Sequence, residues 1–402
     1  MRVLFLPLIT RGSAIGTITR CLAVAEHLRL FGHESFFLTN GEGIKYVKEA
    51  GFSFTAGAPP ESPGKLHPLY DLSDVAVFLN LTRESYLREA LVAEQQAVDY
   101  FRPDALFSEF KLTAPITAAA TGLPLVSTAC SPAHPRFVSP LFREQRAVAH
   151  DDAIEGFNRI LDERGLAPIQ NVAEMFFMRS DLKIAPTVPE IEPLLAGVPN
   201  LHYVGYLLYD RMELVPLPPG LLDRGRGKNI VFVYFSTGEI APAQYTRVLP
   251  QAFDQTEFHA IVAVGDHPEL PELPRPTSNT TWVRHVPGRS ILRCSQALIF
   301  HGGQNTAMAS LIHKVPSLVF PGTDFERDFN ARALARIGAG LHCRVEDFTP
   351  EKLLAATREV VSVSYRLAAE TYSWKILRQG GARFAGDLVL QTAKGGTTSG
   401  PR

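Results

Sequence analysis

Short apolar runs alternate with amphipathic segments along most of the chain. The first apolar run, residues 3–9, leads through a small-residue turn into a segment whose apolar side chains recur every three or four positions, namely Ile18, Cys21, Leu22, Ala25 and Leu28. This spacing predicts a buried β-strand followed by an amphipathic helix. The apolar run at residues 230–235 opens a second series of the same kind. The repeated strand–helix order predicts parallel sheets built from βαβ units.

The expected strands fall into two groups, with a Pro- and Gly-rich stretch between them. They are residues 3–9, 35–38, 105–107 and 125–127 in the first half, and 230–235, 258–264, 281–283, 297–300 and 317–320 in the second. The stretch 206–228 contains VPLPPG and DRGRGK. Because such composition favours neither a helix nor a strand, it predicts a linker.

Two domains follow from this pattern and from the length, since 402 residues are about twice what one domain usually needs. We expect an N-terminal domain at 1–205, a linker at 206–228, a second domain at 229–375, and a final helix and flexible tail at 376–402. In one interpretation this helix crosses back to the first domain. Each domain should be α/β, a doubly wound Rossmann-like parallel sheet. The two sheets would face a central cleft, with ligands at the carboxyl ends of the strands.

Charge and composition exclude several classes of protein. The 40 basic and 41 acidic side chains give a formal net charge of −1, which argues against a surface for nucleic acid. No stretch approaches the ~20 apolar residues that a membrane span needs. The cysteines have no metal-ligand spacing and indicate reduced thiols; they are Cys21, Cys130, Cys294 and Cys343. These features predict a cytoplasmic enzyme without an integral membrane segment. The oligomeric state stays open, a homodimer included.

The strongest chemical signal is an apolar strand at 297–300 that breaks into two glycines and a polar helix start. Gly302 and Gly303 would let the backbone approach a ligand closely. The N–H groups of Gln304, Asn305 and Thr306 would then lie at the positive end of a helix, which favours a phosphate. His301, the last residue of the strand, can donate a hydrogen bond to a phosphate oxygen. The segment therefore predicts a phosphate-binding turn.

Further motifs surround this turn: HVPG at 285–288, KVP at 314–316 and PGTDFERDFNA at 321–331. In this order they resemble the donor signature of nucleotide-sugar glycosyltransferases of the GT-B fold. These include the macrolide and plant-type enzymes (family 1) and the peptidoglycan N-acetylglucosaminyltransferase (family 28). The resemblance covers the donor half almost completely. It implies an inverting, metal-independent transferase that uses a UDP- or dTDP-sugar as a substrate and needs no cofactor.

The resemblance also implies roles for single residues. His285 and the Val286 backbone would meet the nucleobase, and Glu326 and Arg327 would contact the sugar hydroxyls. The diphosphate would be bound by residues of three segments, namely Gly16, Thr237, His301, Gly303, Gln304, Asn305 and Thr306. Two positions differ from the family pattern: Ala309 replaces an acidic residue that binds ribose, and Arg327 replaces a glutamine. The arginine would favour an anionic or unusual sugar.

In the N-terminal half the resemblance is looser and rests on GTITRCLAVAEHL at 16–28 and RPDALFSE at 102–109. Many relatives have a general-base histidine where this chain has Thr17, and a threonine hydroxyl cannot take that role. Glu109, at the place of an aspartate that orients the base, and His134, in the motif SPAHPR, are the alternative bases and acceptor-binding residues. Arg20 would bind an anionic group of the acceptor or donor, or would be a solvated charge.

Aromatic and apolar residues are mixed in the segments 59–91 and 131–179, where the acceptor would bind. This composition suits a small apolar natural product or a lipid-linked acceptor. Because Thr17 replaces the usual base, two other functions stay open. One is an inactive partner protein that binds a nucleotide sugar, and the other is a nucleotide-sugar 2-epimerase on the same fold.

Overall fold

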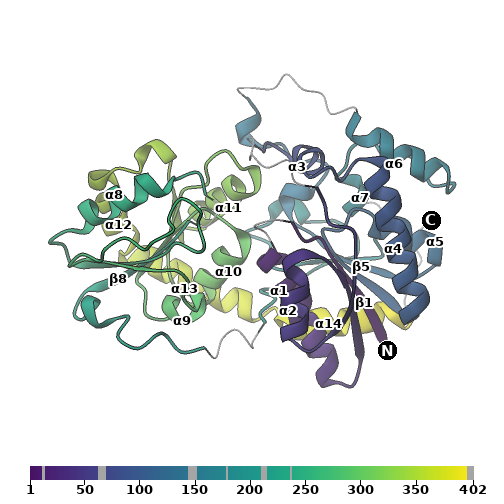
Figure 1. Ribbon diagram of the computed structural model, residues 1–402, viewed down its shortest axis with the longest axis horizontal. Helices are drawn as coiled ribbons and strands as arrows, with labels where there is room; N and C mark the ends of the chain where they lie inside the picture. The colour runs from purple at the N-terminus through teal and green to yellow at the C-terminus, as the bar shows by residue number, and fades with distance from the viewer. Residues whose placement is uncertain are drawn as a thin grey trace. The chain divides into compact units, whose positions relative to one another are not determined.

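The computed structural model describes residues 1–10, 14–61, 69–143, 152–177, 180–209, 215–235 and 238–395. The chain forms two compact units (Figure 1). The first contains Met1–Tyr209 and Arg378–Arg402, and the second contains Asp210–Leu377.

The described part of the first unit has a parallel sheet of seven strands in the order β3-β2-β1-β4-β5-β6-β7. The strands are β1 (Arg2–Pro7), β2 (Glu34–Thr39), β3 (Ser53–Ala56), β4 (Ala105–Glu109), β5 (Leu125–Thr128), β6 (Leu182–Ala185) and β7 (Leu201–Tyr203). Four of them were expected from apolar runs. The strands β3, β6 and β7 were not, because each has only three or four residues and none is uniformly apolar.

Helices cover both faces of this sheet. They are α1 (Ala14–Leu30), α2 (Gly41–Glu49), α3 (Leu72–Phe78), α4 (Glu84–Phe101), α5 (Ala114–Thr121), α6 (Asp152–Asp162), α7 (Glu174–Phe177) and α14 (Gly381–Ala393), with 3₁₀ turns η1 (Ser131–Ala133), η2 (Pro140–Arg143) and η3 (Pro193–Leu195). The final helix α14 packs beside α1. A Cβ on Gly386 would lie 2.5 Å from the Cδ2 atom of His27, so the glycine permits this close helix–helix contact.

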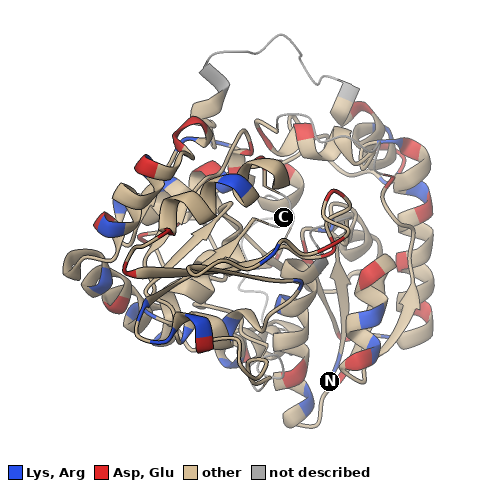
Figure 2. Ribbon diagram, turned by 60° about the vertical axis from the view of Figure 1, so that its left-hand side comes forward, with Lys and Arg blue, Asp and Glu red and all other residues tan. Residues whose placement is uncertain are grey.

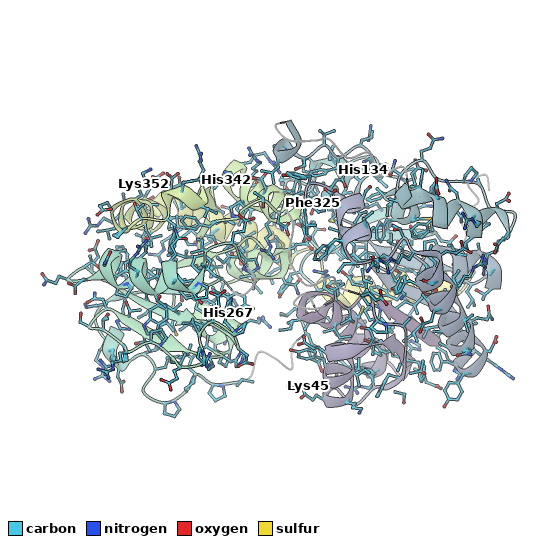
Figure 3. All side chains as sticks on the ribbon, turned by 45° about the horizontal axis from the view of Figure 1, so that its top comes forward. Lys45, His134, His267, Phe325, His342 and Lys352 are labelled. Atoms are coloured by element: carbon cyan, nitrogen blue, oxygen red, sulfur yellow. The ribbon has the colours of Figure 1, made fainter. Side chains whose placement is uncertain are left out.

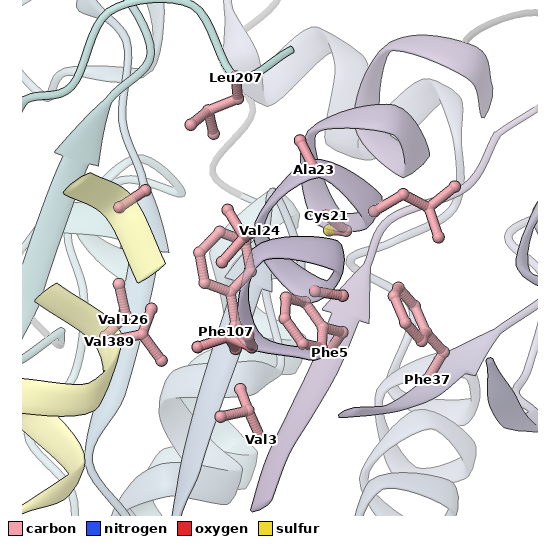
Figure 4. Packing of buried hydrophobic residues seen from close by; sticks show 14 of the residues in the cluster. Val3, Phe5, Cys21, Ala23, Val24, Phe37, Phe107, Val126, Leu207 and Val389 are labelled. Carbon is pink, nitrogen blue, oxygen red and sulfur yellow. The ribbon is translucent and has the colours of Figure 1, made fainter. Parts of the chain in front are cut away.

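The core between the sheet and α1 is aromatic at its centre (Figure 4). Phe5 stacks on Phe37 with 4.9 Å between the ring centroids, and Phe107 lies 5.1 Å away on the other side. Leu207, just before the chain enters the second unit, is buried in the same cluster, as is Val389 of α14. Both ends of the first unit's chain are therefore held by its own apolar core.

The second unit has its own parallel sheet, in the order β10-β9-β8-β11-β12-β13 within the described residues. Its strands are β8 (Asn229–Tyr234), β9 (Phe258–Ala263), β10 (Thr280–Val283), β11 (Ala297–Phe300), β12 (Ser317–Val319) and β13 (Gly340–His342). Only β13 was not expected. The two doubly wound parallel sheets confirm the predicted α/β class.

The helices of the second unit again lie on both faces of the sheet (Figure 1). They are α8 (Pro242–Phe253), α9 (Gly288–Leu292), α10 (Gln304–Ile312), α11 (Phe325–Arg336), α12 (Pro350–Val360) and α13 (Val363–Leu377), with 3₁₀ turns η5 (Asp223–Gly225) and η6 (Val345–Asp347). The helices α8 and α12 pack together over one face, and α10 packs on α13 over the other. Because every connection is a crossover, the carboxyl ends of all six strands meet at one edge.

Acidic and basic residues are interspersed along the described helices that Figure 2 shows. In the part of the chain that the structure describes, no helix combines the length and the apolar character that crossing a membrane requires.

Candidate functional site

Three loops of the second unit converge at the carboxyl ends of the neighbouring strands β8, β11 and β12. Glycines allow each contact between them. A Cβ on the glycine would lie within 3.1 Å of an atom of the facing residue in each of three pairs, namely Gly238 with His301, Gly302 with Arg327, and Gly322 with Glu239. The three loops are thus in close contact with one another beside the start of α10.

The turn after β11 depends on its two glycines in different ways. Gly302 has a φ of +99°, and a Cβ there would lie 2.8 Å from the Arg327 carbonyl oxygen. Gly303 is the N-cap of α10 with ordinary backbone angles. The buried Asn330 side chain donates a hydrogen bond of 2.9 Å from Nδ2 to the Gly302 carbonyl, which holds the turn in place.

The start of α10 has the properties of an anion site. It has no acidic residue in its first turn, so no carboxylate of the helix itself offsets the positive end of the helix dipole. Gln304 is buried, whereas Asn305 and Thr306 are half-buried. The predicted residues of the phosphate turn therefore lie together at one helix terminus. Thr237, the other predicted phosphate ligand of this unit, lies outside the described residues.

His301 lies beside this helix start and is buried. Burial lowers the pKa of its imidazole to about 3, and the Arg327 guanidinium adds to the shift, partly offset by the Tyr234 backbone. Its Nε2 atom is 3.2 Å from the position that a Gly303 Cβ would take, so the ring edge points to the N-cap of α10. A neutral imidazole at this place can donate one hydrogen bond to a bound oxygen.

The predicted sugar-contacting residues, Glu326 and Arg327, lie in the first turn of α11, whose first residue Phe325 is labelled in Figure 3. The N-cap residue Asp324 accepts hydrogen bonds of 3.0 Å from both of their backbone N–H groups. Its other carboxylate oxygen is 3.5 Å from Arg327 Nε. The positive charge of Arg327 is thus partly offset inside the site, which weakens its expected preference for an anionic sugar.

His285 and Val286, the predicted nucleobase contacts, lie on the loop after β10. The His285 side chain is exposed, and its Nε2 is 3.0 Å from an Asp266 carboxylate oxygen. Val286 is half-buried. Both residues are at the same sheet edge as the turn after β11, two strands beyond β8 in the sheet order.

In the first unit, Arg20 of α1 and Glu109 at the end of β4 form a buried ion pair. Arg20 donates from Nε at 2.8 Å and from Nη2 at 2.5 Å, both to Oε1 of Glu109. Arg20 is 6% exposed and Glu109 is 0% exposed, so the alternative of a solvated arginine was wrong. Thr17 and Gly16 lie one turn earlier on α1 and are half-buried.

Cys21, which follows Arg20 on α1, was not singled out by its sequence pattern as part of this site. Burial raises the pKa of its thiol well above the usual value, and the negative charge of Glu109 adds to the shift. The thiol therefore stays protonated and unreactive.

His134 follows the turn η1 and is labelled in Figure 3. Its Nδ1 accepts a hydrogen bond of 3.0 Å from the Arg136 backbone N–H, so its proton is on Nε2. Burial lowers the pKa of the ring, and Arg136 adds to the shift. This arrangement makes His134 a hydrogen-bond donor and a weak base. The buried Glu192 holds the same turn, because its Oε2 accepts a hydrogen bond of 2.6 Å from the Ser131 N–H.

Glu239 is a site residue that the sequence patterns did not reveal. Its Oε1 accepts hydrogen bonds from the backbone N–H of Thr323, at 2.5 Å, and from the Thr323 hydroxyl. The only local signal was its position directly after the FSTG turn.

The four cysteines are free thiols. Within the described ranges, no group of three or more His, Cys, Asp or Glu side chains is arranged to hold a metal ion.

Comparisons with known proteins agree with this architecture. Residues 251–376 match the family model "Erythromycin biosynthesis protein CIII-like, C-terminal domain". The chain is 26% identical to the elloramycin glycosyltransferase ElmGT of Streptomyces olivaceus, over 95% of this chain and 97% of that protein. The solved structure of the glycotransferase of kitacinnamycin has a TM-score of 0.78 at 17% identity, covering 97% of this chain and 98% of that one.

A further solved structure is that of the spinosyn rhamnosyltransferase SpnG complexed with thymidine diphosphate. Its TM-score is 0.68 at 19% identity, covering 96% of this chain and 98% of that one. The expected GT-B fold is confirmed. Of the three functions that the sequence left open, the comparisons support the glycosyltransferase.

Proposed function

We propose that this chain, a family 1-like glycosyltransferase of the GT-B fold, transfers a sugar from a dTDP- or UDP-sugar to a small apolar natural product, with inversion and without a metal ion. We further propose that it acts in the cytoplasm. The observation that carries the proposal is the convergence of three loops around the start of α10, with the neutral His301 beside its N-cap residue Gly303.

The chemistry follows from the charge that develops during transfer. Breaking the bond between the sugar and the diphosphate leaves extra negative charge on the phosphate oxygens. N–H groups of α10 and the His301 ring, already fixed in place, would stabilise that charge more in the transition state than in the ground state. The start of α10 and the neutral His301 side chain, as a hydrogen-bond donor, would thus replace the metal ion that other transferases use.

The nucleobase of the sugar donor is proposed from the ligand of a relative. The structure of SpnG contains thymidine diphosphate, which favours a thymidine nucleotide, with a uridine nucleotide as the second choice. His285 and Val286 would lie against the base at the end of β10.

The class of acceptor is proposed from the burial and protonation of Glu109 and His134, the two alternative general bases. Arg20 already occupies Glu109 Oε1, and the whole Glu109 side chain is hidden from solvent. A general base must be within hydrogen-bond reach of the proton that it removes. His134 has its proton on Nε2 and a lowered pKa. We therefore propose an acceptor that ionises readily, such as a phenol, and that needs little help from a base.

The names of two relatives fit a natural-product acceptor more generally. One is named an elloramycin glycosyltransferase, and SpnG has also been solved with a spinosyn aglycone. Phe110, directly after β4, is only partly buried against the apolar core cluster that includes Met175, Phe176 and Phe177, and we propose that its exposed part contacts an apolar ring system.

The proposal is tested with purified protein and a panel of nucleoside diphosphates and dTDP- and UDP-sugars, first by thermal shift and then by transfer to phenolic acceptors in EDTA. Stabilisation by thymidine or uridine diphosphate and transfer in EDTA are expected. His301→Ala should lower kcat/KM by about 10²–10³-fold, which is typical of losing one fixed donor. Transfer that strictly requires added magnesium, or unchanged turnover of His301→Ala, contradicts the proposal.

A further inference from the structure

The Glu239 carboxylate links two loops across the end of a third strand. Glu239 follows β8 and Thr323 follows β12, and β11 lies between these strands in the sheet. Through Oε1, Glu239 accepts hydrogen bonds from the backbone N–H and the hydroxyl of Thr323. The end of β11, which this contact spans, carries His301 and the start of α10. The carboxylate is therefore next to the proposed diphosphate site.

Gly322 makes room for this carboxylate. Its φ is +66°, and a Cβ there would lie 2.4 Å from Glu239 Cδ, 2.6 Å from Oε1 and 2.8 Å from Oε2. Carbon and oxygen atoms do not approach so closely without a bond. Any other residue at this position would strain the backbone and displace the carboxylate. The glycine and the carboxylate thus form one local arrangement.

The charge of Glu239 indicates which part of a ligand can lie against it. A carboxylate repels phosphate oxygens, so the diphosphate is favoured at the start of α10, beside His301 and away from Glu239. A carboxylate only accepts hydrogen bonds. Oε2 makes no hydrogen bond within the described part of the chain, and the side chain is exposed. Its complement is a neutral or cationic donor group, such as a hydroxyl or an ammonium.

We infer that Glu239 is a specificity-determining residue for the donor sugar. This inference rests on the proposed function and deepens it. Oε2 of Glu239 accepts a hydrogen bond from a hydroxyl or ammonium group of the sugar, while Thr323 and Gly322 hold the carboxylate in position. The nucleoside diphosphate alone makes no such bond.

The test compares a ligand with the sugar and one without it. Binding of thymidine diphosphate and of dTDP-glucose is measured by calorimetry for the wild type, Glu239→Gln and Glu239→Ala. Glu239→Ala should weaken dTDP-glucose by about ten- to a hundredfold, the effect of losing one hydrogen bond to a charged group, and leave thymidine diphosphate within about twofold. Glu239→Gln, which keeps an acceptor oxygen, should lose less.

Two further variants act as controls. Glu272→Gln neutralises another exposed carboxylate of the same unit and should change neither affinity. Gly322→Ala displaces the carboxylate without removing it and should reproduce the selective loss of dTDP-glucose, provided that thymidine diphosphate still binds.

Equal weakening of both ligands by Glu239→Ala would mean that Glu239 only anchors the phosphate loop, and it would overturn the inference. Unchanged binding of both ligands would overturn it as well. A wild type that binds neither ligand would instead contradict the donor-binding role in the proposed function, which separates the two failures.

Discussion

The Arg20 guanidinium places two hydrogen bonds on a single oxygen of Glu109, and both side chains are buried. The two residues are 89 positions apart and come from α1 and β4. In relatives, by the resemblance, this region would hold a histidine base and the acidic residue that orients it. Here the acidic residue is neutralised by an arginine, and Thr17 replaces the base. Removing either partner would leave the other buried without its counter-charge, so a substitution at this pair affects folding as well as chemistry.

Glu109→Ala is expected to destabilise the protein by about 3–5 kcal/mol, because it leaves the buried Arg20 charge without a partner. Glu109→Gln keeps an acceptor oxygen for Arg20 and should lose less. Urea unfolding measures both. If urea unfolding shows that the glutamine variant is folded, its rate is informative: transfer to a phenol should remain within about tenfold of the wild type. A loss of about 10²–10⁴-fold with unchanged donor affinity would identify Glu109 as the base instead.

Thr17→His places an imidazole one helical turn before Arg20. If the wild type lacks a strong base, this variant should raise transfer to an unactivated alcohol by at least about tenfold, while transfer to a phenol changes little. Product formation is followed by chromatography, with Thr17→Gln as a control of similar size that cannot act as a base. Rapid glycosylation of a simple alcohol by the wild type, unaffected by Glu109→Gln and His134→Ala, would contradict the base-free interpretation.

Two neighbouring glycine variants should behave differently. Gly302→Ala is expected to lower both the melting temperature and the affinity for thymidine diphosphate, since φ is +99° and a Cβ would press on the Arg327 carbonyl. Gly303→Ala has no backbone strain, and its methyl group would meet the His301 ring, 3.2 Å from Nε2 and 3.9 Å from Cδ2. It should keep the melting temperature and weaken binding by about tenfold or more through obstruction of the phosphate site. Equal affinity in Gly303→Ala and the wild type would place the phosphate elsewhere.

Stability should depend on pH through His301. Its pKa in the folded protein is about 3, because of burial and then Arg327, below the ~6.5 of an unfolded histidine. As the pH falls, the His301 side chain therefore binds a proton at a higher pH in the unfolded state than in the folded state. The free energy of unfolding falls as the pH decreases from about 6.5 toward 3, and this contribution is constant above that range. Between pH 7.5 and 5 the wild type should lose about 2 kcal/mol more than His301→Gln in urea unfolding. His313, whose pKa burial lowers to about 4, contributes equally to both proteins.

The transferred sugar should invert its anomeric configuration. The resemblance to inverting transferases implies a single displacement, and Asp324 in the second unit is engaged by the first N–H groups of α11. We therefore expect no covalent sugar intermediate. Proton NMR of the product, formed from a donor of known anomer, measures the configuration. A retained configuration would mean that a nucleophile of the protein takes part.

The sequence by itself determined the parts of the protein that depend on neighbouring residues. An apolar run, two glycines and a polar helix start at 297–306 specify a strand, a turn and a helix terminus, since each step is a local backbone preference. The same holds for the alternation that predicted two parallel sheets. Short strands such as β13 were beyond this reasoning, because three residues at a sheet edge are selected by their neighbours in the sheet rather than by their own pattern.

Only the tertiary structure decided which charged groups meet. Arg20 and Glu109 are 89 positions apart, and Glu239 and Thr323 are 84 apart, so no spacing in the sequence links either pair. Burial is also a tertiary property, and it lowers the pKa of His301 so that the imidazole stays neutral at acidic pH. The types of residue in the site can therefore be predicted from the sequence. Their charge states and partners arise only where the ends of strands come together, because electrostatic interactions depend on distance and on exclusion of water.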